Sequence, residues 1–400
     1  MALPSFPETT ALANSLNDIK PTSFLNEIER IQTLQAAYAL ISRLETPWET
    51  IVRLGMNQPA LVASLKVSKD LALFEKWHGS SNAPMTSAQL AAMVGCDDDS
   101  LLVRLLRHLA SNHMLKEPAA GMFEPTPFTL SLVEPVFGEW IHYMYDAIIP
   151  CFYNMPEFLS KTGYKNPTDP ADGVFQYAKK WKGDLFQYYD SHSREGQSFN
   201  HVMGAVMAQQ ASWLDIFPHA AIAADHISGK PLVVDVGGNI GHDLERFRAA
   251  HPETATDLYL QDRAEVVRLS KCPDPVNKMA HDFFKTQPIE GSRVYYMHGV
   301  LHDWPDEQAL NILKMTREAM RPGYSKLLIH DHVIREPMAH PHTTSYDLTM
   351  MVKIAGQERT ESQWTKLLGL AGLEVVKIWR SSLAVQAIVE AEPMGEVASS

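Results

Sequence analysis

The chain has 400 residues, more than one hydrophobic core usually serves, so its length predicts two domains. Apolar residues make up 45% and charged residues 20%, a balance typical of globular rather than disordered proteins. The formal net charge of −12 argues against a nucleic acid or an anionic membrane as partner, because both attract basic surfaces.

The cysteines and the N-terminus indicate a cellular compartment. Cys96, Cys151 and Cys272 are far apart and odd in number, which favours free thiols in a reducing cytoplasm over a disulfide framework. The N-terminus lacks the features of a signal peptide, and no apolar run of about 18 residues is present that could span a membrane. We therefore expect a cytoplasmic protein without a membrane partner. No Cys/His spacing indicates a metal site.

Helices dominate the first part of the chain. Residues 1–25 carry many Ser, Pro, Asn and Thr residues, and we expect a loose arm there. Apolar residues recur at helical spacing over residues 24–43, and further helices are predicted after Pro47 and over residues 59–77.

A winged-helix pattern follows. Thr86 can cap a short helix, the acidic residues 97–99 begin a second one, and Gly121 is placed to turn a small hairpin. Such a module either binds DNA or serves structure and dimerisation, and acidic residues on an acidic chain favour the second role. Residues 133–217 are then mostly helical and rich in aromatic and Met side chains, which either form a core or line a pocket for a flat apolar ligand.

From residue 231 onward, short apolar strands alternate with amphipathic helices, a pattern typical of a parallel, doubly wound sheet. The last two predicted strands, residues 374–378 and 384–389, are joined by a short turn and must form an antiparallel hairpin at one edge. The sequence thus predicts an α/β fold in its C-terminal half.

A glycine-rich turn joins the first of these strands to a helix. Its glycines, Gly237, Gly238 and Gly241, permit a sharp turn and close approach of a ligand. Asp262, at the end of the next strand, is placed to accept hydrogen bonds from ribose hydroxyls. Asp235 would repel a pyrophosphate and instead suits a cationic ligand or one that carries an amino acid group.

More polar residues follow later strands at the same edge of the sheet. Asp282 and Phe283 could bind an adenine amino group and cover its ring. His302 lies at the edge where ligands bind in open α/β sheets, together with Asp331 and Glu358. A histidine held by two acids has a raised pKa and a fixed tautomer, which suits proton abstraction from a hydroxyl.

The segments DVGGNIG, LYLQD, HDFF, VLHDWPDE and GQERTESQW together resemble the S-adenosylmethionine-dependent O-methyltransferases of the plant caffeate and fungal secondary-metabolite type. The resemblance covers nearly the whole chain. It implies a winged-helix dimerisation domain over residues 1–130, a helical connector that lines the substrate pocket over residues 131–217, and a Rossmann-like catalytic domain over residues 218–395. It also implies a homodimer and S-adenosylmethionine as cofactor.

The resemblance also implies a role for each site residue. His302 would be the general base, flanked by Asp331 and Glu358. The residues that would line the methyl donor's pocket are Asp235, Gly237, Gly238, Gly241, Asp262, Asp282, Phe283, His298 and Trp304. The acceptor, a small aromatic or polyketide-type metabolite, would face Phe175, Tyr177, Met207, Gln210 and Lys353.

Three positions depart from the family pattern. Asn239 replaces a usual glycine, and Asp331 replaces a usual glutamate, so its contact with His302 would be looser or mediated by water. Lys353 is either a solvent-facing residue at a helix end or a cation aimed at an acidic or carbonyl-bearing substrate.

The second interpretation of Lys353 opens an alternative function. Some fungal relatives keep this fold and its cofactor but catalyse pericyclic or dehydration reactions, for which Lys353 or His302 would act as a hydrogen-bond donor. An intact His302 with two acids favours methyl transfer. A non-catalytic binding or regulatory module would need a basic face, and the composition offers none.

Overall fold

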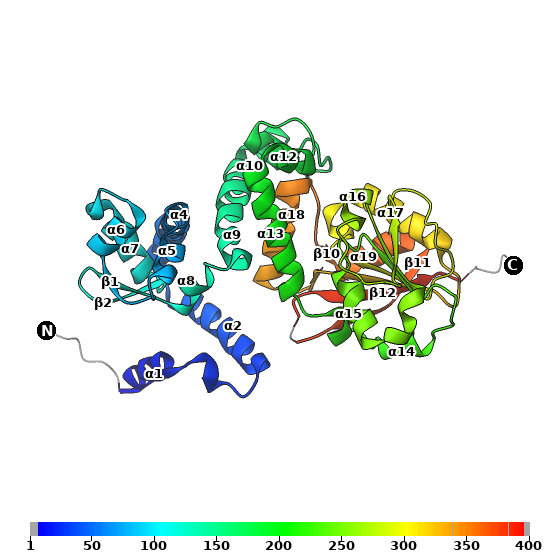
Figure 1. Cartoon of the computed structure of the whole chain (residues 1–400), viewed down its shortest axis with the longest axis horizontal. Coiled ribbons are helices and arrows are strands. Elements are labelled where there is room, and N and C mark those ends of the chain that lie inside the picture. Colours follow the sequence, from blue (N-terminus) through cyan, green and yellow to red (C-terminus); the bar gives the residue numbers. More distant parts are fainter. Residues whose placement is uncertain (1–6, 338, 383, 396–400) are drawn as a thin grey trace. The chain divides into compact units, whose positions relative to one another are not determined.

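The computed structural model describes residues 7–337, 339–382 and 384–395 (Figure 1). Within these ranges, the side chains of residues 7, 8, 205 and 207–209 are not described. Contacts divide the chain into two compact units, Met1–Ala60 and Leu61–Ser400. Among the described residues, no helix combines the length and the apolar character needed to cross a membrane.

The first unit is helical, and its described side chains are not buried. The loose arm expected over residues 1–25 is wrong for part of its length, because a helix forms within it. Asn26 and Thr46 cap two of the helices through their side chains. The helices are α1 (Pro7–Asp18), η1 (Pro21–Ser23), α2 (Glu27–Leu44), α3 (Pro47–Val52) and η2 (Arg53–Asn57).

The second unit begins with the predicted winged helix. Gly121 has a φ of 70° and turns the expected hairpin of a three-stranded antiparallel sheet ordered β1-β3-β2. The helix expected over residues 59–77 is broken, because Ala72 adopts a left-handed conformation with a φ of 52°. The elements are α4 (Gln58–Asp70), α5 (Leu73–Gly79), β1 (Met85–Thr86), α6 (Ser87–Val94), α7 (Asp99–Ser111), β2 (Leu115–Ala119), β3 (Met122–Pro125) and α8 (Pro127–Ser131).

A helical connector follows, as predicted. Its helices are α9 (Pro135–Tyr143), η3 (Met144–Ile148), α10 (Ile149–Lys161), α11 (Val174–Lys179), α12 (Leu185–Ser191), α13 (Ser193–Gln209), η4 (Trp213–Asp215) and α14 (Ala220–Ala224). A much later helix, α18 (Pro341–Ile354), packs into the same aromatic core through Met350, Val352 and Ile354 (Figure 1). The packing of α18 thus brings a segment of the C-terminal part of the chain beside the connector helices.

The C-terminal part contains a seven-stranded sheet ordered β11-β12-β8-β7-β4-β5-β6. Strands β4 to β8 pair in parallel, whereas β12 pairs antiparallel with both β8 and β11, so the predicted α/β sheet and its antiparallel edge hairpin are confirmed. The strands are β4 (Val233–Val236), β5 (Leu258–Asp262), β6 (Asn277–Ala280), β7 (Val294–His298), β8 (Lys326–Asp331), β11 (Leu373–Arg380) and β12 (Ala387–Pro393).

Helices cover this sheet, and two buried apolar clusters fill the space between. The helices of this part are α15 (His242–Ala250), η5 (Pro252–Asp257), α16 (Ala264–Val267), η6 (Leu301–Asp303), α17 (Asp306–Ala319) and α19 (Glu361–Leu370). The strand order reverses beside β4, whose neighbours are β5 and β7. Ligands of open α/β sheets bind outside the carboxyl ends of the strands at such a point.

A short parallel ladder pairs β9 (Val333–Ile334) with β10 (Arg359–Thr360). Since β9 closely follows β8, this ladder carries Glu358 to the carboxyl edge of the main sheet.

Candidate active site

The glycine turn after β4 is tightly packed. A Cβ added to Gly238 would lie 2.4 Å from the Asp235 carboxylate. A Cβ added to Gly241 would lie 2.3 Å from the Cys272 sulfur. Gly237 and Gly241 also have φ angles of 73° and 92°, a region that favours glycine. The turn therefore has no room for a side chain at these positions.

Asn239 stands at the turn position where the resemblance expects glycine. Its φ of 54° is left-handed, and asparagine tolerates this conformation better than most residues. Its backbone N–H donates to Asp262 Oδ2 at 2.8 Å. The substitution therefore preserves the shape of the turn.

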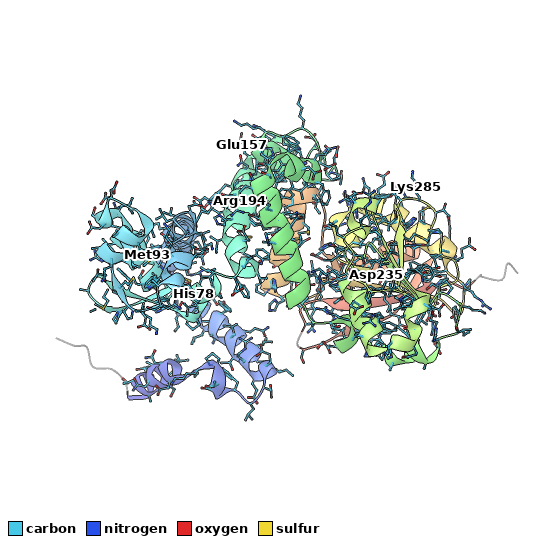
Figure 2. All side chains as sticks on the ribbon, viewed as in Figure 1. His78, Met93, Glu157, Arg194, Asp235 and Lys285 are labelled. Atoms are coloured by element: carbon cyan, nitrogen blue, oxygen red, sulfur yellow. The ribbon has the colours of Figure 1, made fainter. Side chains whose placement is uncertain are left out.

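Asp235 is buried at the end of β4 inside the sheet domain (Figure 2). Neither carboxylate oxygen has a hydrogen-bond partner among the described residues. Burial raises its pKa well above the usual range, and the charges of Asp243 and Asp262 add to this. A buried acid without a partner is unfavourable, so this position fits a ligand that brings a positive charge.

Asp262 ends β5 beside the turn. Its two carboxylate oxygens accept hydrogen bonds from the backbone N–H groups of Arg263 and Asn239, at 2.7 and 2.8 Å. Each oxygen retains a free lone pair for a ribose hydroxyl. Burial raises the pKa of this carboxyl.

Two aromatic side chains lie near the turn. A Cβ added at Gly237 would come within 3.7 Å of the Phe283 ring, and the Phe283 and Trp304 ring centroids are 6.1 Å apart. Asp282 is exposed beside them and accepts a hydrogen bond from the Phe284 backbone N–H at 3.0 Å. The predicted donor-pocket residues described so far thus gather at one edge of the sheet.

His302 forms the centre of an acidic cluster. Its Nδ1 lies 2.8 Å from Glu358 Oε1, and its Nε2 lies 3.5 Å from Asp303 Oδ1. Burial opposes protonation of His302, but the charges of Glu358 and Asp303 outweigh it and raise the pKa to about 10. Burial likewise disfavours the Glu358 carboxylate, yet His302 lowers the pKa of Glu358 to about 2.

The second predicted acid behaves differently. Asp331 accepts a hydrogen bond from the Gly299 backbone N–H at 3.1 Å and acts on His302 through its charge alone. Burial raises the pKa of Asp331 to about 6. The contacts that sequence reasoning missed are those of Asp303, which adjoins His302 in the chain, and of His332, whose Nδ1 lies 3.5 Å from Glu358 Oε1.

His298 ends β7 and contacts Asp243, which follows the glycine turn. Its Nδ1 contacts Asp243 Oδ2 at 2.6 Å, and its Nε2 contacts Gln210 Oε1 at 3.0 Å and Gln386 Oε1 at 3.1 Å. The ring stacks on His330 with centroids 4.0 Å apart. The structure therefore links His298 to the acceptor side of the site.

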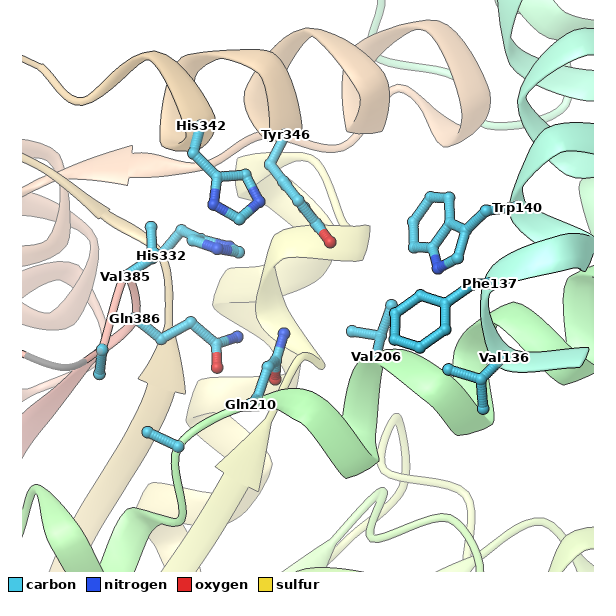
Figure 3. A pocket seen from close by; sticks show the side chains of 12 residues that line it. Val136, Phe137, Trp140, Val206, Gln210, His332, His342, Tyr346, Val385 and Gln386 are labelled. Atoms are coloured by element: carbon cyan, nitrogen blue, oxygen red, sulfur yellow. The ribbon is translucent and has the colours of Figure 1, made fainter. Parts of the chain in front are cut away.

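A cavity of about 280 Å³ adjoins this network (Figure 3). Apolar side chains of α9 and α13 form one side of it, and polar side chains form the other. The lining residues are Val136, Phe137, Trp140, Val206, Gln210, Ala211, His332, His342, Tyr346, Ala384, Val385 and Gln386.

Of the four expected acceptor-facing residues whose side chains the structure describes, Gln210 alone lines this cavity. Phe175 is buried in the connector core, where its ring packs edge-on against Tyr188 at 5.1 Å. The Tyr177 hydroxyl donates to Glu157 at 2.6 Å. The side chain of Met207 lies outside the described part of the structure. Aromatic density alone could not separate core residues from lining residues.

Lys353 is not solvent-facing, so that interpretation is wrong. Its side chain is 4% exposed, and its Nζ lies 5.0 Å from the Tyr143 ring and 5.1 Å from the Phe199 ring. Burial lowers its pKa to about 8, against the charge of Asp303. Lys353 lies beneath the acidic cluster and not on the cavity wall.

The chain matches two family models. Residues 171–374 match an O-methyltransferase domain, and residues 56–134 match an O-methyltransferase dimerisation domain. The O-methyltransferase mfmE of Annulohypoxylon moriforme is 61% identical over 96% of this chain and 95% of its own length.

Solved structures share the fold. A structure described as a pericyclic reaction enzyme superposes with a TM-score of 0.85 at 27% identity, covering 97% of this chain and 100% of that one. OxaC in complex with sinefungin and meleagrin superposes with a TM-score of 0.81 at 25% identity, covering 96% of this chain and 97% of that one. The chain therefore belongs to the O-methyltransferase family, whose methyl donor is S-adenosylmethionine.

Proposed function

We propose that this protein transfers a methyl group from S-adenosylmethionine to a hydroxyl of a small aromatic or polyketide-type secondary metabolite. The observation that carries the proposal is the contact between His302 and Glu358, at the same sheet edge as the tightly packed glycine turn. The similarity to O-methyltransferase mfmE over nearly the full chain supports the same activity.

The residues of the turn fit the proposed methyl donor. Asp235 would face its positive charge, Asp262 would accept hydrogen bonds from its ribose, and Phe283 and Trp304 would cover its adenine. The sulfonium makes the methyl group electrophilic, so the protein must align the two substrates and remove a proton. Alignment can contribute on the order of 7–11 kcal/mol to lowering the barrier.

His302 is the proposed base. Glu358 holds the hydrogen on Nδ1, which leaves Nε2 to accept the hydroxyl proton of the acceptor. The positive charge of a bound donor lowers the pKa of His302, because like charges repel. General-base catalysis contributes roughly 10²–10⁴ in rate. Asp331 and Lys353 would tune the electrostatics of this cluster.

The finer organisation is also a proposal. We place a dimerisation domain over residues 1–130, a connector over residues 131–217 and a catalytic domain over residues 218–395, in a cytoplasmic homodimer that binds neither nucleic acid nor membranes. The match to a dimerisation domain and the exposed apolar side chains of the first unit support the dimer.

The alternative is a pericyclase or dehydratase that keeps the donor site without transferring methyl. The likeness to a pericyclic reaction enzyme supports it, and a protonated His302 could donate a hydrogen bond to a carbonyl. Against it, Lys353 is buried under aromatic rings rather than directed into the cavity.

One experiment separates the two functions. The purified protein is incubated with methyl-labelled S-adenosylmethionine and a panel of phenolic and pyridone metabolites. Label in the product supports methyl transfer. Product without label, lost in Lys353→Met, would refute methyl transfer and establish the alternative.

A further inference from the structure

We propose that Gln210 and Gln386 form a pair of amide donors that binds an oxygen of the methyl acceptor. The acceptor then carries a carbonyl, or a similar hydrogen-bond-accepting oxygen, next to the hydroxyl that is methylated. This inference rests on the proposed function and deepens it, since it names the chemical class of the acceptor.

The first step is that His298 holds both glutamine oxygens. Gln210 Oε1 and Gln386 Oε1 lie 3.0 and 3.1 Å from the same atom, His298 Nε2. Asp243 is buried, and its hydrogen bond and attraction to His298 outweigh burial and lower its pKa, so it is ionised. The Asp243 carboxylate accepts the hydrogen on Nδ1, and its charge attraction to His298 is that of an anion to a protonated ring, so Nε2 also carries a hydrogen and donates to the two amide oxygens.

The second step is that the amide nitrogens are left for a ligand. With the oxygens fixed on His298, both nitrogens lie on the side that faces His332 and Tyr346 (Figure 3). Both glutamines line the cavity, and no hydrogen bond joins either amide nitrogen to another residue in the described ranges. A ligand oxygen is therefore the partner that these donors lack.

The third step concerns the rest of the cavity. Opposite the glutamines, Phe137, Trp140 and Val206 offer an apolar wall that suits a flat ring. On the polar side, His332 shares Glu358 with His302. An acceptor with two oxygens on one edge can thus bind the amide pair with one oxygen and place the other near His332, which lines the cavity, whereas His302 is not among the described lining residues.

This arrangement makes the site selective. An acceptor without the second oxygen would displace water from both amides and leave them without partners, which costs binding energy. A site built to hydrogen-bond an oxygen rejects analogues that lack it. We expect a difference in affinity of about tenfold between matched ligands.

The test uses two probes of similar shape, ortho-hydroxyacetophenone and ortho-ethylphenol, which differ in the carbonyl oxygen. Their dissociation constants are measured by calorimetry on the full-length protein with S-adenosylhomocysteine bound, so that no turnover occurs. We expect the ketone to bind about tenfold more tightly. The preference should disappear in the near-isosteric double variant Gln210→Met/Gln386→Met. It should persist in Gln197→Met, an exposed glutamine on helix α13, whose C-cap is Gln210.

Equal affinity for the two probes, no binding of either, or a preference that survives in the double variant would overturn the proposal. Thermal unfolding of each variant shows whether the fold is retained. Because binding is measured without methyl transfer, the outcomes are separable. A ketone preference without methylation of any phenol would refute the proposed function alone, whereas methylation without the preference would refute this inference alone.

Discussion

Glu358 organises the proposed catalytic residues through one oxygen. Its Oε1 lies 2.8 Å from His302 and 3.5 Å from His332, while its backbone N–H donates to Asp347 of α18. The sequence predicted the His302–Glu358 pair, because both residues follow strands or turns at one sheet edge. The shorter side chain of Asp331 also predicted its looser contact with His302, but its hydrogen bond to the Gly299 backbone depends on packing that the sequence does not disclose.

Replacing His302 tests the base directly. We expect His302→Ala to lower the rate of methyl transfer at least tenfold, because general-base catalysis contributes roughly 10²–10⁴. Binding of S-adenosylhomocysteine, measured by calorimetry, should stay unchanged, since His302 is not part of the glycine turn. Turnover equal to that of the unmodified protein would remove His302 from its role.

Replacing Glu358 tests how the pKa of His302 is set. A base accepts a proton only in its neutral form, so kcat/KM should rise with pH until the pKa of His302, about 10 in the free protein, is reached. Glu358→Gln removes the charge that raises this pKa, so the rise should end at a lower pH. Glu374→Gln, an exposed site on β11, should leave the profile in place. An unshifted profile in Glu358→Gln would exclude the coupling.

At the scale of elements, the sequence predicts contacts between neighbouring strands and turns better than contacts between helices far apart in the chain. The strand and glycine pattern of residues 231–262 predicted the turn and the position of Asp262 beside it, since these contacts form between neighbouring strands and turns. Helix α18 packs among connector helices far away in the chain, so its pattern showed neither that Lys353 is buried nor that Tyr346 lines the cavity. Such positions depend on tertiary packing and not on periodicity.

The glycine turn gives a prediction at this scale. A methyl group at Gly238 would lie 2.4 Å from the Asp235 carboxylate and 2.6 Å from Leu260, so Gly238→Ala forces both to move. We expect a loss of stability of about 1–3 kcal/mol and at least tenfold weaker donor binding. Gly369→Ala in α19, whose nearest added contact is 3.8 Å away, is the control. Denaturant unfolding and calorimetry measure both quantities, and wild-type values for Gly238→Ala would contradict the packing argument.

At the scale of the whole molecule, the first unit, residues 1–60, lacks a buried core among its described side chains. Leu25 is 91% exposed and Trp48 is 71% exposed, and no described side chain within residues 9–60 is buried. Composition and charge could exclude classes of partner, but they could not show that these helices lack a core of their own. An apolar surface of this extent is typical of a protein interface.

The proposed homodimer can be tested through this surface. We expect light scattering to show a dimer, and we expect Leu44→Asp/Trp48→Asp to weaken it at least tenfold, because charges replace exposed apolar side chains. Gln35→Asp, which adds a charge on α2 without removing an apolar side chain, should leave the dimer intact. A monomeric wild-type protein would refute the proposal.

Asp235, a buried carboxyl group without a hydrogen-bond partner in the described part of the chain, affects the thermodynamics of donor binding. The raised pKa of Asp235 means that this carboxyl binds a proton more readily than usual, and a cation placed beside it would lower that pKa. Binding of the sulfonium of S-adenosylmethionine should therefore release protons. The binding enthalpy measured by calorimetry should then vary with the ionisation enthalpy of the buffer. Asp235→Asn should reduce that variation and leave the part that His302 contributes.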